Sequence, residues 1–314
     1  MLGLLMSFKV DESPEPDGIC ACLLKEARVE IWGALTSIFV PSLATGKVPE
    51  DWRVAKTCGG MLMKDQGLLK SPGFPDLYPN NLHCIWLIRT PNYKNKIFLQ
   101  FTKFQVEQFI NCYSDRVIIY DGGSLESTVL DGPTCGSENP AVVSSEGSLL
   151  VEFFSSRTWR AYGFSAKIQF VECGYTLTNK KGNIDFRAWK KDDLKHKCWW
   201  ALLIPRSFKI VFTLITLHIR SNENCTADYL AIHDVAANPH TLLGKYCGKL
   251  SEPVTFTSTG RTLVLELSHL KSDLGWGFSA EYKSIITSVM FIVASGQQRT
   301  YFVMVCLITN IALS

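Results

Sequence analysis

The sequence carries no catalytic motif. It has neither the His-Glu-x-x-His motif of a zinc protease nor a serine nucleophile context beside a candidate His/Asp pair. It also lacks the Cys-x-x-Cys pairs that are typical of zinc sites, so structural zinc is not expected. These absences predict a protein that is not an enzyme.

Charge of one sign and long apolar runs are also scarce. The formal net charge is +3 and is spread along the chain, which gives no indication of a nucleic-acid partner. Residues 1–8 are apolar but lack a basic start and a small-residue cleavage site, so they are not a convincing signal peptide. In residues 284–314 two apolar runs are separated by a polar stretch that includes Arg299. Because a spanning helix needs about twenty uninterrupted apolar residues, membrane anchoring through this tail is not expected.

Cysteine, by contrast, is abundant: eight of the 11 cysteines form two matching quartets. The second quartet repeats the first with each gap one residue shorter, which indicates an internal repeat. This framework predicts disulfide bonds in an oxidising, extracellular compartment, with free core thiols as the alternative. The quartets are Cys58, Cys84, Cys112 and Cys135, and then Cys173, Cys198, Cys225 and Cys247. Cys20, Cys22 and Cys306 have no obvious partners.

From Cys58 onward the chain alternates short apolar segments with Gly/Pro turns. IFLQFTKFQVE (97–107) and DRVIIYDG (115–122) are strand-length examples. Many short strands separated by such turns predict an all-β protein, built as antiparallel sandwiches with apolar inner faces. A length of 314 residues predicts at least two domains.

Residues 1–57 differ in character from the rest. Apolar residues at helical spacing predict a short helix over about residues 22–40. Residues 13–55, with Pro-Asp-Gly, LLKE and TGKVPEDWR in order, resemble the start of reverse transcriptases from vertebrate non-LTR retrotransposons. No Asp-Asp polymerase motif follows, so we interpret this extension as a transposon-derived fragment or a gene-model artefact without enzymatic activity.

The repeated region resembles the CUB domain family. In the first repeat, CGG, SPGFPDLYPNN, CIW, IIYDGG and GFSAKI follow one another, and in the second CGYTLTNKKGNI, CTADYLAIHD and GWGFSAEY do so. The resemblance implies two jelly-roll-like β-sandwiches, over residues 58–172 and 173–283, followed by the tail 284–314. The second repeat lacks a counterpart of SPGFPDLYPNN and has IDFRAWKKDD instead.

The resemblance also implies the disulfide pairing. The expected bridges are Cys58–Cys84, Cys112–Cys135, Cys173–Cys198 and Cys225–Cys247. On the chain-entropy model each bridge contributes roughly 3–4 kcal/mol of stability. Because Cys173 follows directly on the last strand of the first domain, we expect a fairly rigid pair.

Many CUB domains bind calcium, and the first repeat keeps three of the four family ligands: Tyr78, Glu107 and Asp115. The fourth, an aspartate, is replaced by Ser156 in a loop that reads SSRTWRAYGF. Calcium takes six to eight oxygen ligands and gains affinity with each ligand charge, so this loss weakens the expected site.

Two further interpretations of these acids stay open. One of the arginines in that loop, Arg157 or Arg160, pairs with an acid in place of the ion, or the acids are uninvolved surface residues. In the second repeat the glutamate position is Arg220, and His269 lies near the missing aspartate, so no calcium is predicted there although Asp228 is kept.

Three other features have both a structural and a functional interpretation. Asn224 begins a formal glycosylation sequon whose middle residue is Cys225. Trp86, Trp199 and Trp200 lie beside cysteines and are expected to pack in the core. The basic cluster of Lys180, Lys181 and residues 187–197 is either a solvated face or a site for an anion such as a sulphated glycan.

Taken together, these features favour a non-catalytic, secreted module of two CUB domains that recognises another extracellular protein. If calcium binds, the family resemblance implies that Glu107 and Asp115 also receive a lysine of the partner. The alternative is that the chain is the non-catalytic portion, or an isoform, of a secreted CUB-containing protease. The sequence does not identify the partner.

Overall fold

The computed structural model describes residues 56–187, 196–237, 239–269, 276–286, 289–291 and 304–306. The chain divides into two compact units, Met1–Ala55 and Lys56–Ser314. The helix predicted over residues 22–40 and most of the tail 284–314 lie outside the described residues. Among the described residues, no helix is both long enough and apolar enough to cross a membrane.

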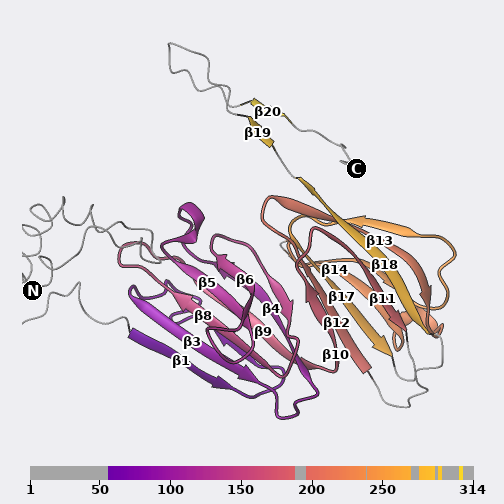
Figure 1. Ribbon diagram of the computed structural model, residues 1–314, viewed down its shortest axis with the longest axis horizontal. Helices are drawn as coiled ribbons and strands as arrows, with labels where there is room; N and C mark the ends of the chain where they lie inside the picture. Colours follow the sequence, from indigo (N-terminus) through magenta and orange to yellow (C-terminus); the bar gives the residue numbers. More distant parts are fainter. Residues whose placement is uncertain are drawn as a thin grey trace, which may run out of the picture. The chain divides into compact units, whose positions relative to one another are not determined.

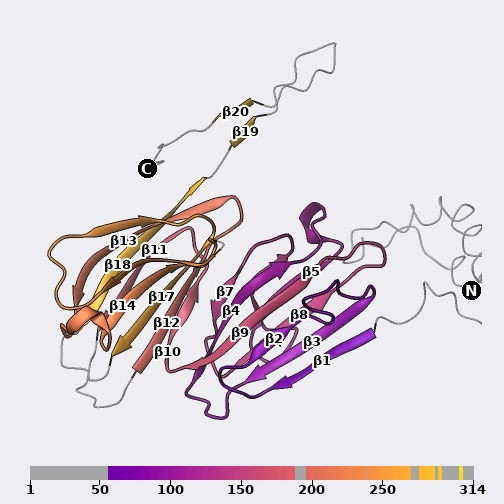
Figure 2. The same ribbon diagram turned by 180° about the vertical axis from the view of Figure 1, so that it is seen from behind.

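The first sandwich consists of two sheets (Figures 1 and 2). One sheet has the strand order β1-β3-β8-β5-β6 and the other β2-β9-β4-β7. The strands are β1 (Lys56–Leu62), β2 (Leu68–Lys70), β3 (Leu82–Arg89), β4 (Lys96–Gln105), β5 (Arg116–Asp121), β6 (Thr128–Thr134), β7 (Ala141–Val143), β8 (Ser148–Phe154) and β9 (Gly163–Val171). A short 3-10 turn, η2 (Ile110–Cys112), lies between β4 and β5.

The second sandwich repeats this arrangement. Its sheets have the strand orders β10-β12-β17-β14-β15 and β11-β18-β13-β16. The strands are β10 (Cys173–Leu177), β11 (Lys181–Arg187), β12 (His196–Leu203), β13 (Phe208–His218), β14 (Tyr229–Asp234), β15 (Thr241–Tyr246), β16 (Val254–Thr257), β17 (Thr262–His269) and β18 (Gly277–Ile286). The turn η3 (Glu223–Cys225) corresponds to η2, and β19 (Val289–Phe291) pairs with β20 (Met304–Cys306).

The predicted all-β class is confirmed, but the sandwiches are not antiparallel throughout. β1 pairs with β3 in parallel, and β10 pairs with β12 in parallel. The reason is topological: after β1 the chain crosses to β2 in the facing sheet and then returns, so β3 runs in the same direction as β1. Two parallel neighbours cannot be joined by a hairpin, which the sequence alone did not indicate.

The cores follow the alternation of the strands. In β3 alternate side chains are buried, so every second side chain enters the first core. The largest fully buried residues include Phe101, Phe153 and Phe164 in the first core and Trp200 and Phe212 in the second.

The four bridges that the family resemblance implies are present in the structure. Cys58 and Cys84 are opposite one another in the parallel pair β1/β3, and Cys173 and Cys198 are opposite one another in β10/β12. The other two bridges, Cys112–Cys135 and Cys225–Cys247, fix the turns η2 and η3. The bridges thus repeat in position as well as in sequence.

The two sandwiches contact one another within the unit Lys56–Ser314. The edge strand β7 lies against β10 and β12. The rings of Phe98 and Trp199 are stacked, with centroids 4.3 Å apart. The Thr176 hydroxyl accepts a hydrogen bond from the Val143 N–H at 2.7 Å and donates one to the Val143 carbonyl oxygen at 2.8 Å. Trp199 therefore packs against the other domain, unlike Trp86 and Trp200, which lie in the two cores as expected.

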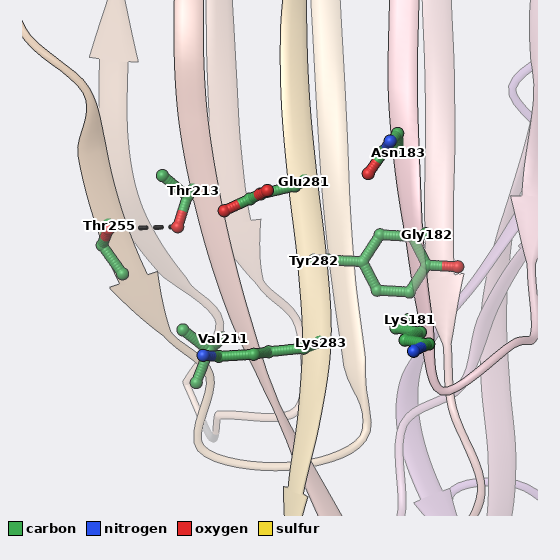
Figure 3. Close-up of a pocket in the computed structure, with 9 residues that line it drawn as sticks. All are labelled: Lys181, Gly182, Asn183, Val211, Thr213, Thr255, Glu281, Tyr282 and Lys283. Carbon is green, nitrogen blue, oxygen red and sulfur yellow. Dashed lines mark hydrogen bonds between the residues drawn. The ribbon is translucent and has the colours of Figure 1, made fainter. Parts of the chain in front are cut away.

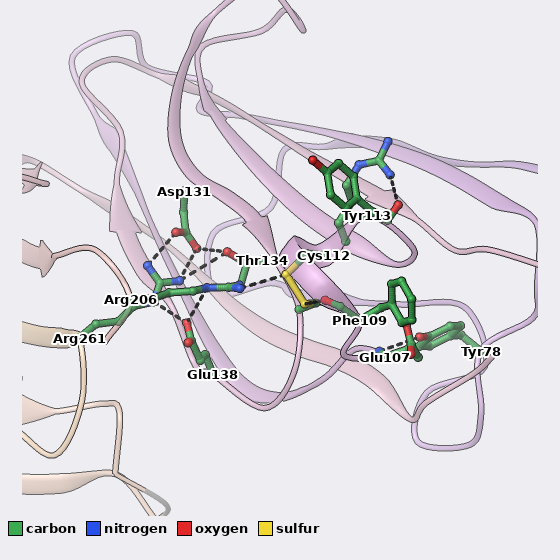
Figure 4. The surroundings of a disulfide bond; sticks show 12 residues. Tyr78, Glu107, Phe109, Cys112, Tyr113, Asp131, Thr134, Glu138, Arg206 and Arg261 are labelled. Carbon is green, nitrogen blue, oxygen red and sulfur yellow. Dashed lines mark hydrogen bonds and ion pairs between the residues drawn. A yellow bond between two sulfur atoms is a disulfide. The ribbon is translucent and has the colours of Figure 1, made fainter. Parts of the chain in front are cut away.

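A buried arginine completes this contact (Figure 4). Arg261, at the start of β17, donates to both carboxylate oxygens of Asp131 in β6, at 2.8 and 3.0 Å. Its Nε also donates to Glu138. Burial alone lowers the pKa of Arg261, but the two carboxylates more than offset this and hold the pKa of the guanidinium above its ordinary value. That the contact makes the pair rigid stays a prediction.

Candidate functional site

The candidate calcium ligands lie on loops at one end of the first sandwich. The loop 106–115 joins β4 to β5, and the loop 155–162 joins β8 to β9. Gln105 is opposite Gly163 and Arg116 is opposite Phe154, so both loops leave the sandwich at the same end. This register brings residues more than 40 positions apart into one site.

Tyr78 and Asp115 are hydrogen-bonded at the centre of the site. The Tyr78 hydroxyl donates to Oδ2 of Asp115 at 2.5 Å, and the Ser156 backbone N–H donates to Oδ1 at 2.7 Å. Both Tyr78 and Asp115 are fully buried. Ser156 therefore occupies the place next to Asp115 that the family resemblance assigns to the missing aspartate.

Glu107 lies beside Tyr78 (Figure 4). Its backbone N–H donates to the Tyr78 hydroxyl at 3.0 Å. Its Oε2 atom is buried and has no hydrogen-bond partner. Desolvation first, and then the negative charge of Asp115, raise the pKa of Glu107 above its ordinary value. Among the described residues, no positive charge contributes to the pKa shift of Glu107.

Two more buried oxygens at this end of the domain have no hydrogen-bond partner among the described residues. They are Oγ of Ser156 and Oδ1 of Asn80, and the Asn80 amide N–H₂ donates to the backbone oxygen of Arg157 in the same loop. Unpartnered buried oxygens are the donor set that a hard cation prefers. However, the described residues contain no cluster of three His, Cys, Asp or Glu side chains that could hold a metal. The residues therefore fit a calcium ion only at the weak end of its affinity range.

The arginines of the loop 155–162 are exposed. Both oxygens of Asp115 bind neutral donors, and Oε2 of Glu107 binds none. The two effects on the Glu107 pKa both raise it, whereas a paired guanidinium would lower it. These observations favour a cation over an arginine at this position, and the choice between the two stays a prediction.

The Cys112–Cys135 bridge fixes the loop that carries Glu107 and Asp115. Asn111 and Cys112 have positive φ values of 53° and 55°, which few residues other than glycine adopt without support. In addition, Nη1 of Arg206 lies 3.0 Å from Sγ of Cys112 (Figure 4). The loop therefore depends on the bridge and on a residue of the second domain.

Exposed apolar side chains surround the site, and sequence reasoning missed them. Their exposed fractions lie between 54% and 74%: Phe109, Ile110, Tyr113, Trp159 and Tyr162. Their position in loops, outside the alternating pattern of the strands, could have indicated that these side chains are exposed. Exposed aromatic side chains at a loop end are typical of protein-binding surfaces.

Among its described residues, the second domain differs from the first at the corresponding positions. The Arg220 guanidinium, at the position of Glu107, lies over the Trp276 ring at 5.5 Å from the centroid. Asp228 is buried directly before β14. Asn224 is exposed, and its neighbour Cys225 is bridged to Cys247. The φ value of Asn224, 54°, is close to the 53° of Asn111, so the turn is the same in both repeats, although the position of Glu107 holds Arg220.

Comparison with known families decides the assignment. The model of the CUB domain matches residues 58–168 and 173–282. This chain belongs to the CUB family. The matched ranges begin at Cys58, so the resemblance of residues 13–55 to a reverse transcriptase gains no support from them.

Curated CUB proteins align with most of the chain. Human tolloid-like protein 1 is 32% identical over 228 residues, which cover 72% of this chain and 22% of that protein. The embryonic protein UVS.2 of Xenopus laevis is 29% identical over 235 residues, covering 72% of this chain and 43% of that protein. Human cubilin is 29% identical over 253 residues, covering 79% of this chain and 7% of that protein. The chain thus matches less than half the length of each of these relatives.

Solved CUB structures are similar at lower identity. The CUB1-EGF-CUB2 region of human MASP-1/3 is 21% identical, with a TM-score of 0.31, covering 71% of this chain and all of that one. The MASP-1 CUB2 domain bound to Ca²⁺ is 24% identical, with a TM-score of 0.32, covering 36% of this chain and 98% of that one.

Proposed function

We propose that this CUB pair is a non-catalytic, extracellular module that recognises another protein at the calcium-site end of its first domain. The extracellular assignment is supported by the four disulfides, which persist in oxidising compartments. The observation that carries the proposal is the buried, unpartnered Oε2 of Glu107 beside Asp115, within a rim of exposed aromatic side chains.

Calcium is the cation that this site would take. Glu107, Asp115 and the free oxygens of Ser156 and Asn80 would hold it, while Tyr78 keeps Asp115 oriented. A bound ion would supply the positive charge that the two carboxylates lack and would order the loop 106–115. The acids would then accept a lysine of the partner, and the rim would bury its aromatic surface around that contact.

We expect Glu107→Gln to abolish calcium binding to the full chain. The wild-type protein is expected to bind calcium with a dissociation constant of about 10⁻⁴–10⁻³ M, because one ligand carboxylate is missing. The substitution removes the negative charge of a carboxylate whose buried Oε2 has no hydrogen-bond partner among the described residues. Isothermal titration calorimetry at millimolar calcium measures the difference.

Glu126→Gln is the matched control, since Glu126 is an exposed acid of the same domain. It should leave the calcium affinity unchanged. No heat from the wild-type protein at millimolar calcium would overturn the metal assignment and leave the arginine alternative.

Calcium affinity should fall on mild acidification. The pKa of Glu107 is raised, so protons compete with the ion at a higher pH than they would for an ordinary glutamate. In the calcium-free protein, acidification has the opposite effect, on stability. Ionisation of Glu107 costs stability above its folded pKa, and this cost disappears below its unfolded pKa. Titrations between neutral pH and the ordinary glutamate pKa of 4.5 measure the first effect. An affinity that is constant over this range would contradict it.

The recognition function itself is tested by capture from extracellular fluid. The immobilised full chain should retain a protein in calcium and release it in a chelator, and the Glu107→Gln chain should retain none. Equal retention by both chains would place the partner elsewhere on the molecule.

A second candidate is that the pair forms the non-catalytic part of a secreted CUB-containing protease. It is supported by the small share of tolloid-like protein 1, 22%, that the match covers. Transcripts that join the coding region of residues 58–283 to a protease domain would favour this candidate.

Glycosylation of Asn224 also stays a proposal. Its exposure makes the side chain accessible, while the bridged Cys225 inside the sequon disfavours modification.

A further inference from the structure

The outer face of the second domain contains an open depression. It has a volume of about 650 Å³ and lies on the sheet β11-β18-β13-β16 (Figure 3). Most of its lining consists of side chains that alternate outward from these strands. The structure therefore gives the second domain a surface depression of its own.

Two lysines lie directly opposite one another in this depression. Lys181 of β11 is paired with Lys283 of β18, and Val211 of β13 is the next residue across the sheet. Like charges at directly opposite positions on neighbouring strands destabilise a sheet. Neither lysine takes part in an ion pair among the described residues, and in Figure 3 the Lys283 side chain extends toward Val211, away from Lys181.

Positive charge extends along the same face of the sheet. Lys209 of β13 is opposite Ile285 and lies on the same face as Val211, because alternate residues of a strand point to the same side. Lys180 lies on the opposite face, where its ammonium is 4.5 Å from the centroid of the Phe208 ring. Three lysines on one face exceed what one carboxylate or sulfate needs, so they suit an anion that repeats along a polymer.

The next row across the sheet is neutral or acidic and rich in hydrogen-bonding groups. Asn183 is opposite Glu281, which is opposite Thr213, and the Thr213 and Thr255 hydroxyls are hydrogen-bonded at 3.1 Å (Figure 3). Amide, hydroxyl and carboxylate groups in one row are suited to sugar hydroxyls. Glu281 repels a sulfate, so sulfates are confined to the lysine row and sugar hydroxyls to this one.

From this arrangement we propose that the outer sheet face of the second domain binds a sulfated glycosaminoglycan chain. Sulfate groups bind between Lys181 and Lys283 and beside Lys209, and sugar hydroxyls bind the row that contains Asn183 and Glu281. The inference is independent of the calcium site, which lies in the other domain.

The test uses the full chain and a heparin-derived hexasaccharide. The double variant Lys181→Gln/Lys283→Gln should lose about tenfold or more in affinity, because each lysine contributes charge-assisted hydrogen bonds. It should also unfold at a slightly higher temperature without ligand, because the repulsion across the strands is removed. Binding of the wild-type protein should weaken as salt concentration rises.

The matched control is Lys64→Gln/Lys94→Gln, which removes the same charge from exposed lysines of the first domain. It should keep the affinity within about twofold of wild type. An equal loss in both double variants would mean binding by net charge alone and would overturn the proposal. So would undiminished binding of a desulfated hexasaccharide, or no binding of the sulfated one.

Discussion

Replacement of Arg261 by methionine is expected to lower the free energy of unfolding by about 3–5 kcal/mol. The substitution leaves the Asp131 carboxylate buried, with the Thr134 hydroxyl as its remaining hydrogen-bond donor, at 2.9 Å. An uncompensated buried charge is far more costly than the intact pair is favourable, since the pair already carries a large desolvation penalty. Chemical denaturation followed by tryptophan fluorescence measures the change, because Trp199 lies in the same contact between the domains.

The double variant Arg261→Met/Asp131→Leu separates the two contributions. Because it removes both charges, it should regain most of the lost stability. The control Arg187→Met removes an arginine whose ion pair with Asp185 is exposed, and should change stability by at most about 1 kcal/mol. If Arg261→Met were as mild as this control, the buried contact between the domains would not exist in solution.

Removal of the Cys112–Cys135 bridge by a double serine substitution should lower the free energy of unfolding by about 3–4 kcal/mol. The bridge closes a loop with a sequence separation of 23 residues. It also holds the positive φ values of the turn that precedes Asp115. We therefore expect both a lower denaturation midpoint and a weaker calcium affinity, measured by urea titration and by calorimetry.

The Cys225–Cys247 bridge is the natural control for this variant, since it closes a loop with a separation of 22 residues in the second domain. Its removal should cost similar stability but leave the calcium affinity of the first domain unchanged. A loss of calcium binding in both variants would mean that the bridges act only through global stability.

Features that repeat in the sequence could be predicted from it. The repeated cysteine spacing predicted the internal repeat, and the family resemblance implied the pairing, which places Cys58 opposite Cys84 and Cys173 opposite Cys198. The acids at 107 and 115 were likewise found because their distance from Cys112 is a local feature. Local spacing and the two-residue alternation of strands can be recognised in the sequence, because the geometry of the backbone determines them.

Contacts between distant residues could not be predicted in this way. Arg261 and Asp131 are 130 positions apart, and nothing in either local sequence marks the pairing. The parallel pairing of β1 with β3 depends on an excursion of the chain through the facing sheet. Trp199 is adjacent to Trp200 in sequence, yet the alternation of the strand turns it toward the first domain.

The hydrogen bonds of Thr176 to Val143 have a consequence for how the first domain behaves alone. β7 is the last strand of its sheet, and a bare sheet edge is a template on which another chain can add a strand. Thr176 occupies both backbone groups that Val143 turns away from β4. The second domain therefore covers these two backbone groups, and an isolated first domain would expose them at the edge of its sheet.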